Sequence, residues 1–184
     1  MSGARMQYRT LGRSGIKVSL LGLGTGGERR LGQTEGLSQE QQTAFVRKSL
    51  DLGINFFDTS EGYGQSEAIL GEALKGVPRS SYVLATKWQH DGRQGADPLM
   101  TRGAQGMVDS LETSLKRLRT DHVEVLMFHG IHPGTYNTIF ERFLPTMLRL
   151  KEQGKVRLTG FSERFPEDPA HTAAAMGVKQ HPAQ

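Results

Sequence analysis

Three short apolar runs in this chain each end on a side chain that can move a proton or hold a charge. The runs close with Asp58, Lys87 and His129. Each is rich in β-forming residues and flanked by helix-like segments, which is typical of a buried parallel strand. A fourth group, Tyr63, follows the first run in a glycine-flanked turn. Because ligands bind at the carboxyl ends of parallel strands, these four groups at one edge would indicate proton-transfer chemistry.

Each of the four side chains also has a purely structural interpretation. A loop tyrosine commonly packs as an amphipathic residue, and a strand-end aspartate commonly caps the next helix. A lone lysine at a strand end is usually solvated, and a lone histidine is usually hydrogen-bonded in a core or at an edge. Only the convergence of all four at one edge favours a catalytic interpretation.

The elements that would position these groups alternate between strands and helices. A hairpin is expected over residues 6–18, and strands are expected over 19–24, 55–58, 82–87, 123–129 and 156–161. Ser38 and Gln41 predict a capped helix whose apolar face comprises Ala44, Phe45, Leu50 and Leu52. Further helices are expected over 66–75, through 108–118, from a first turn containing Pro145 to Gln153, and weakly over 168–176.

Five βα units in chain order predict an α/β protein with a parallel sheet. A closed eight-stranded barrel typically needs about 250 residues, and this chain has 184. Two architectures remain open on this evidence, an open doubly wound sheet and the front part of a barrel. Five strands would leave two unpaired edges, so self-association through these edges is a further expectation.

Composition excludes several classes of function. The absence of cysteine excludes disulfides, thiolate metal sites and a cysteine nucleophile. Lysine and arginine are scattered among acids despite the net charge of +4, so no nucleic-acid partner is expected. No apolar stretch reaches signal-peptide or membrane-spanning character, which predicts a cytoplasmic protein without a membrane partner. His90, His122 and His132 lack helical i, i+4 ligand partners, so no metal is expected.

The segment Gly22-Leu23-Gly24-Thr25-Gly26-Gly27 satisfies the G-x-G-x-x-G pattern after a predicted strand. A dinucleotide-binding motif of this type needs a helix beginning at the glycines and an acid about 20 residues later. Here a polar loop over residues 28–36 intervenes, and the acid closing the next strand is Asp58. A Rossmann site is therefore disfavoured. The glycines form a tight turn, or Gly24, Thr25 and Gly26 let the backbone approach a ligand.

Segments spread in order along the chain resemble the aldo-keto reductase family. The matching residues are 6–12 with Gly15 and Val18, 22–25, 53–60, 63–64, 66–71, Lys87, 110–118, Asp121, His129 and 154–162. The resemblance implies a (β/α)8 TIM barrel, here truncated to about five strands with an N-terminal hairpin. Residues 1–184 would then form one incomplete domain, with the hairpin at 6–18, strands and helices over 19–163, and a weakly specified tail at 164–184.

The resemblance further implies reduction of aldehyde or ketone carbonyls with NADP(H), or with NAD(H). Asp58, Tyr63, Lys87 and His129 match the family's catalytic tetrad, with Tyr63 as proton donor and His129 also contacting the substrate. The family holds the nicotinamide amide with a serine and an asparagine after strand five. This chain has Ser162 and Glu163 there, so Glu163 departs from the pattern.

Two alternatives complete the set of expectations. Trp88 is interpreted either as a wall of the substrate pocket or as ordinary packing. The chain as a whole is interpreted either as a reductase or as a non-catalytic truncated barrel, serving as a regulatory or binding module that lacks the full cofactor site.

Overall fold

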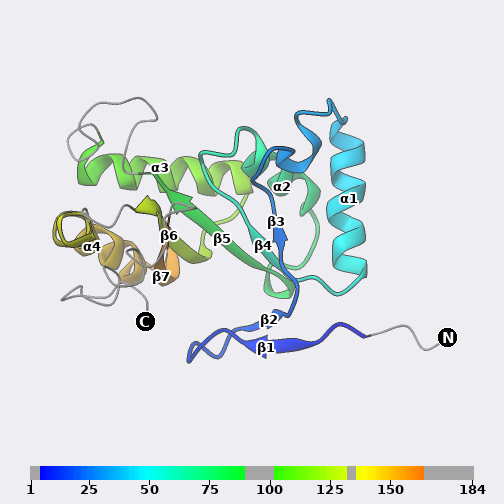
Figure 1. The fold of residues 1–184 in the computed structure, drawn as a ribbon. Coiled ribbons are helices and arrows are strands. Elements are labelled where there is room, and N and C mark those ends of the chain that lie inside the picture. Colours follow the sequence, from blue (N-terminus) through cyan, green and yellow to red (C-terminus); the bar gives the residue numbers. More distant parts are fainter. Residues whose placement is uncertain (1–4, 90–101, 132–135, 164–184) are drawn as a thin grey trace. The chain divides into compact units, whose positions relative to one another are not determined.

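The computed structural model describes residues 5–89, 102–131 and 136–163 (Figure 1). Contacts group the chain into two compact units. The first comprises Met1–Thr86 and Ser114–Asp121, and the second comprises Lys87–Thr113 and His122–Gln184. One strand and one helix contribute residues to both units.

The first unit contains the hairpin and the first parallel strands. β1 (Tyr8–Thr10) and β2 (Lys17–Ser19) pair antiparallel, which confirms the hairpin. β3 (Leu23–Gly24), β4 (Phe56–Asp58) and β5 (Val83–Trp88) follow as parallel neighbours. The first core strand is shorter than the predicted 19–24, because residue 19 belongs to the hairpin and only two residues pair with β4.

Two helices of the first unit pack against each other, α1 (Gln39–Asp51) and α2 (Ser66–Ala73). The predicted capping box is confirmed, since the Ser38 hydroxyl accepts from the Gln41 N–H. The apolar face predicted for α1 is wrong. Phe45 and Leu52 are 53% and 60% exposed, whereas α1 buries Gln42, Val46 and Ser49. Short 3-10 turns at Arg30–Gly32 and Arg79–Ser81 complete the unit.

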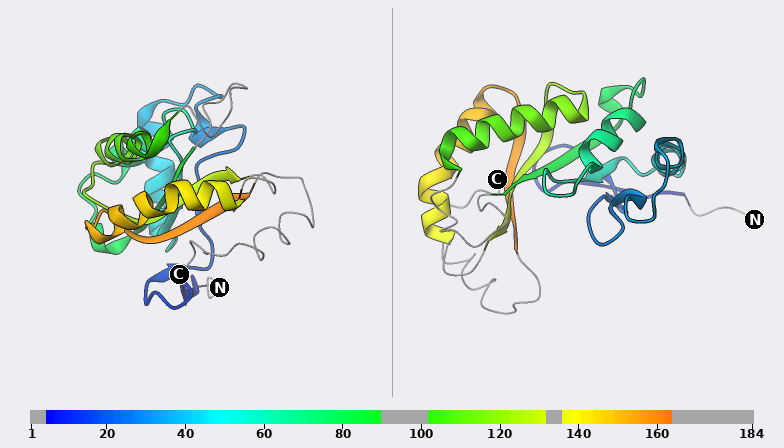
Figure 2. Two further views of the ribbon diagram at one scale, coloured as in Figure 1. Left: turned by 90° about the vertical axis from the view of Figure 1, so that its left-hand side faces the viewer. Right: turned by 90° about the horizontal axis from the view of Figure 1, so that it is seen from above.

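The second unit pairs β6 (Val123–Ile131) with β7 (Val156–Glu163) in parallel. Helix α4 (Tyr136–Glu152) lies along β7, as Figures 1 and 2 show. Helix α3 (Gly103–Leu118) contributes residues to both units. Aromatic rings in edge-to-face or tilted contact fill much of this core: Trp88, Phe128, Tyr136, Phe140, Phe143 and Phe161. The sheet strands follow in the order β3-β4-β5-β6-β7, in agreement with the predicted α/β class.

Pro145 lies inside α4 and not in its first turn, so that prediction is wrong. A proline inside a helix removes one backbone hydrogen bond and costs roughly 3 kcal/mol. Pro145 is exposed, and so is Glu141, whose carbonyl loses its partner to the proline ring. Water can satisfy that carbonyl. The helix buries apolar residues both before and after the proline: Ile139, Phe140, Phe143, Leu144, Met147 and Leu150.

Some predictions fall outside the described residues. They are the weak helix over 168–176, the tail from 164 onward, His90 and His132. Among the helices that the structure describes, none has the length and apolarity needed to cross a membrane.

Candidate functional site

The first unit brings two of the predicted site segments together at the carboxyl ends of β3 and β4. The Thr25 N–H donates to the backbone carbonyl of Asp58 at 2.9 Å, so the turn after β3 lies beside the end of β4. Gly24 is paired in register with Asp58, and Asp58 with Ala85. The Asp58 residue is half-buried, as expected for a polar group at a strand end.

Tyr63 belongs to the same cluster. A Cβ placed on Gly26 would lie 2.7 Å from two carbons of the Tyr63 ring, so the ring rests against the bare Cα of this glycine. The Tyr63 N–H donates to the Ser60 carbonyl at 3.0 Å, and the Tyr63 carbonyl accepts from the Ser66 N–H at 3.2 Å. The backbone on both sides of the phenol is therefore held by turns.

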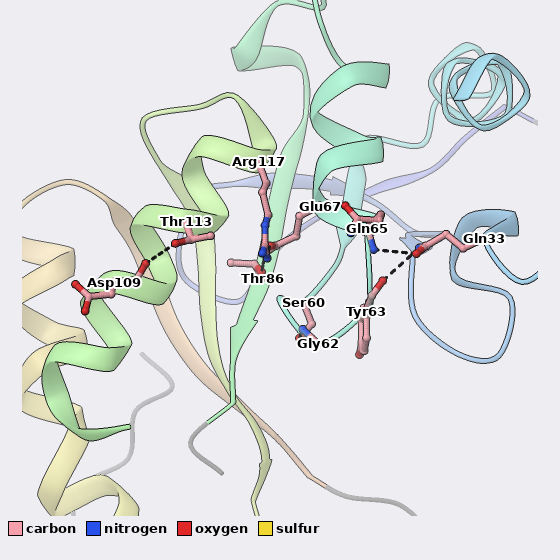
Figure 3. A network of polar contacts seen from close by, with 10 residues as sticks. All are labelled: Gln33, Ser60, Gly62, Tyr63, Gln65, Glu67, Thr86, Asp109, Thr113 and Arg117. Carbon is pink, nitrogen blue, oxygen red and sulfur yellow. Dashed lines mark hydrogen bonds and ion pairs between the residues drawn. The ribbon is translucent and has the colours of Figure 1, made fainter. Parts of the chain in front are cut away.

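A residue that sequence analysis missed, Gln33, connects the loop after β3 to this turn (Figure 3). Its Oε1 accepts from the Gln65 N–H at 2.8 Å, and its Nε2 donates to the Tyr63 carbonyl at 3.2 Å. Nε2 also lies 2.9 Å from the Ser66 Oγ and 2.6 Å from the Arg30 carbonyl. Gln33 stands in a polar loop without periodic patterning, so no signal in the sequence identified it.

A buried carboxylate follows one turn later. Glu67 on α2 is 1% exposed, accepts from the Thr86 hydroxyl at 2.7 Å and pairs with Arg117 at 3.3 Å (Figure 3). Thr86 immediately precedes Lys87 on β5. Glu67 therefore connects the helix that follows Tyr63 to the strand that carries Lys87.

We expect the substitution Arg117→Met to destabilise the protein by about 2 kcal/mol, since it leaves the Glu67 carboxylate buried without its cation. Because Arg117 is partly exposed, the expected loss of stability is smaller than that for a fully buried ion pair. Urea unfolding measures it. Lys116→Met is the matched control, because it removes an exposed charge from the same helix end and should change stability by less than about 0.5 kcal/mol. Equal losses in both variants would contradict the role of the ion pair.

The second unit holds Lys87 and Trp88. Lys87 is 6% exposed and Trp88 is 1% exposed. The Trp88 ring centroid lies 5.0 Å from that of Phe143 and 6.2 Å from that of Phe128, both in edge-to-face geometry. Of the two roles predicted for Trp88, the structure shows the packing role. A contact between Trp88 and substrate stays a prediction.

His129, Ser162 and Glu163 lie near the carboxyl ends of β6 and β7. His129 is half-buried, and the N–H of the next residue, Gly130, donates to the Ser162 Oγ at 3.4 Å. Ile131 is paired in register with Glu163. The structure thus gathers Gly24 to Gly26 with Asp58 and Tyr63 in one unit. It gathers His129 with Ser162 and Glu163 in the other unit. The convergence of both sets of residues on one site stays a prediction.

Comparison with known proteins bears on both sets. The sequence profile of the aldo/keto reductase family matches residues 21–178. The chain belongs to the aldo/keto reductase family. It is 38% identical to L-galactose dehydrogenase of Arabidopsis thaliana over 163 residues, which are 86% of this chain and 49% of that protein. It is 35% identical to a putative voltage-gated potassium channel subunit beta of Schizosaccharomyces pombe, over 91% of this chain and 48% of that one.

Solved aldo-keto reductases share the fold. A putative aldo-keto reductase from Pseudomonas aeruginosa superposes with a TM-score of 0.71 at 32% identity, over 85% of this chain and 59% of that one. The holo form of an aldo-keto reductase from Bacillus halodurans superposes with a TM-score of 0.71 at 30% identity, over 86% of this chain and 51% of that one. The chain spans about half the length of the curated relatives it matches. Its five strands therefore correspond to part of the aldo-keto reductase barrel, and the open doubly wound alternative is excluded.

The residues after β3 fit a nicotinamide cofactor of the kind this family generally uses. Thr25 is fully buried, and its Oγ1 makes no hydrogen bond within the described part of the chain. An unsatisfied buried hydroxyl costs about 1–3 kcal/mol, which favours a ligand group at this position. A Cβ on Gly24 would meet no described atom within 4 Å, so a ligand could approach this backbone closely.

Proposed function

We propose that this chain supplies the proton-donating part of a carbonyl reductase that uses NADP(H), or NAD(H), to convert aldehydes or ketones to alcohols. The observation that carries the proposal is the cluster of the β3 turn, Asp58 and Tyr63 at the carboxyl ends of neighbouring parallel strands. In barrel enzymes this end of the strands carries the active site.

Tyr63 is the proton donor in this proposal. A phenol is neutral at pH 7, so its Oη can deliver a proton to the carbonyl oxygen as the carbonyl carbon is reduced. The Lys87 ammonium would stabilise the phenolate that remains after proton transfer. Asp58 would hold that ammonium in place through an ion pair, and His129 would donate a hydrogen bond to the carbonyl oxygen.

The strand register supports a pairing of Asp58 with Lys87. Asp58 is paired with Ala85, and Lys87 follows Ala85 by two residues on the same strand. Side chains two residues apart on a strand point to the same face of the sheet. A buried ammonium also needs a compensating negative group, and Lys87 is buried.

The cofactor, when bound, supplies the hydride that the protein cannot provide. Thr25 would bind it through its buried hydroxyl, with the backbone of Gly24 and Gly26 and the residue Asp58 contributing to the same cofactor site. Ser162 would hold the carboxamide, and Glu163 would take the position of the family's asparagine.

The direct test is NAD(P)H oxidation with a panel of aldehydes, with NAD(P)⁺ reduction by L-galactose as the reverse assay suggested by the Arabidopsis relative. We expect measurable turnover that follows Michaelis–Menten kinetics in the carbonyl compound. Trp88 is the single tryptophan of the chain, so quenching of its emission can report cofactor binding independently of turnover. Absence of turnover, with or without cofactor binding, would refute the reductase proposal.

A non-catalytic module is the second candidate. It is favoured by the relative named as a putative potassium channel subunit. This candidate predicts cofactor binding without turnover, or a stable folded chain with neither. The same two measurements therefore separate the candidates.

A further inference from the structure

The loop between β3 and α1 reaches the turn that carries Tyr63 through one side chain. Gln33 is half-buried and comes from the segment after the 3-10 turn Arg30–Gly32. Figure 3 shows its amide lying between Tyr63 and Gln65. Both ends of the amide are used, because Oε1 accepts from the Gln65 N–H while Nε2 donates to the Tyr63 carbonyl.

The orientation of the Gln33 amide follows from its partners. Nε2 faces the backbone carbonyl oxygens of Arg30 and Tyr63, which can only accept hydrogen bonds. The atom facing Oε1 is a backbone N–H, which can only donate. Reversing the amide would place like groups against each other on both sides. A glutamine is therefore required here, and an isosteric carboxylate would lose the donor half.

Two backbone features accommodate this side chain. Gly64 has a φ of +63°, and a Cβ there would lie 2.6 Å from the Gln33 Oε1, so only glycine admits the amide at this point. Arg30 and Leu31 adopt φ values of 42° and 57°, a left-handed conformation that L-residues disfavour. The Gln33 Nε2 donates to the Arg30 carbonyl at 2.6 Å and so stabilises the turn that delivers it.

We infer that Gln33 is the positioning residue for the proton donor, an assignment that rests on the proposed role of Tyr63. The amide holds the Tyr63 carbonyl and the Gln65 N–H, and the ring is held against Gly26. The backbone of residue 63 and the face of its ring are thereby restricted from two directions. Displacement of a catalytic group by about 1 Å can lower a rate about 100-fold, so this restriction matters to turnover.

The test uses Gln33→Glu in the full chain, with Gln39→Glu as the control. Gln39 is an exposed residue of α1 whose amide donates a hydrogen bond to the Thr43 hydroxyl, and its substitution makes the same change of charge. Four tyrosines are present, so ¹³Cζ labelling gives four NMR signals, and Tyr63→Phe assigns one of them. We expect Gln33→Glu to shift or split the Tyr63 signal, while the signals of Tyr8, Tyr82 and Tyr136 stay in place.

In the turnover assay Gln33→Glu should lower kcat at least about tenfold with little change in the KM for the cofactor. Gln33→Met, which is uncharged and similar in volume, should reproduce both effects. An unchanged Tyr63 signal would overturn the inference, and so would a change shared by all four tyrosines, since that would place the effect in the whole fold. Failure of the reductase proposal is distinguishable from failure of this inference. The wild type would then show no turnover, while the NMR comparison would still report whether Gln33 positions Tyr63.

Discussion

Replacing Tyr63 with phenylalanine is expected to lower kcat for carbonyl reduction by about 10²–10⁴-fold, the usual contribution of a positioned general acid. The substitution removes only the Oη and its proton. The ring rests against Gly26, and the backbone bonds of residue 63 do not involve the side chain, so the fold should be preserved. Stopped-flow or steady-state oxidation of NADPH with an aldehyde measures the loss.

Cofactor affinity separates a chemical effect from a structural one in this variant. The dissociation constant for NADPH should change by less than about threefold if the phenol acts only in the transition state. Tyr8→Phe is the matched control, since Tyr8 is 43% exposed in the hairpin and its hydroxyl donates to the Gly53 carbonyl. Unchanged turnover in Tyr63→Phe would remove this residue from the proton-donor role.

The parallel strands could be predicted closely because their apolar runs have clear ends. The prediction of 82–87 became Val83–Trp88, and that of 156–161 became Val156–Glu163. The failures arise where a pattern has more than one physical solution. The α1 sequence offered an apolar face at Phe45 and Leu52, yet tertiary contacts bury Val46 beside two polar residues. Periodicity identifies a helix but not which side of it is covered.

The positions of the candidate site residues could be predicted where they follow from strand ends. β4 ends at Asp58, and β5 ends one residue after Lys87, so parallel topology alone places them on the carboxyl side. Gln33 and Glu67 could not be found in this way. Their partners lie far along the chain, with Gln33 bonded to Gln65 and Glu67 to Arg117. A long-range hydrogen bond leaves no local periodicity in the sequence.

The same limitation applies to close backbone contacts, and Gly71 provides the sharpest test. Gly71→Ala in the middle of α2 would ordinarily stabilise a helix by about 1 kcal/mol. Here a Cβ would overlap the Arg117 carbonyl oxygen and would lie 2.9 Å from the Leu118 carbonyl carbon. Backbone atoms cannot rotate aside as side chains do, so α2 and the end of α3 must separate. We expect destabilisation of about 3 kcal/mol, measured by urea unfolding.

Gly106→Ala is the control, because Gly106 also lies within a helix and its nearest contact is the side chain of Arg102 at 3.1 Å. That variant should be neutral or slightly stabilising. The separation caused by Gly71→Ala should also stretch the Arg117 to Glu67 ion pair, so its effect should be less than additive with that of Arg117→Met. A Gly71→Ala protein as stable as the wild type would show that the end of α3 leaves room for a Cβ at residue 71.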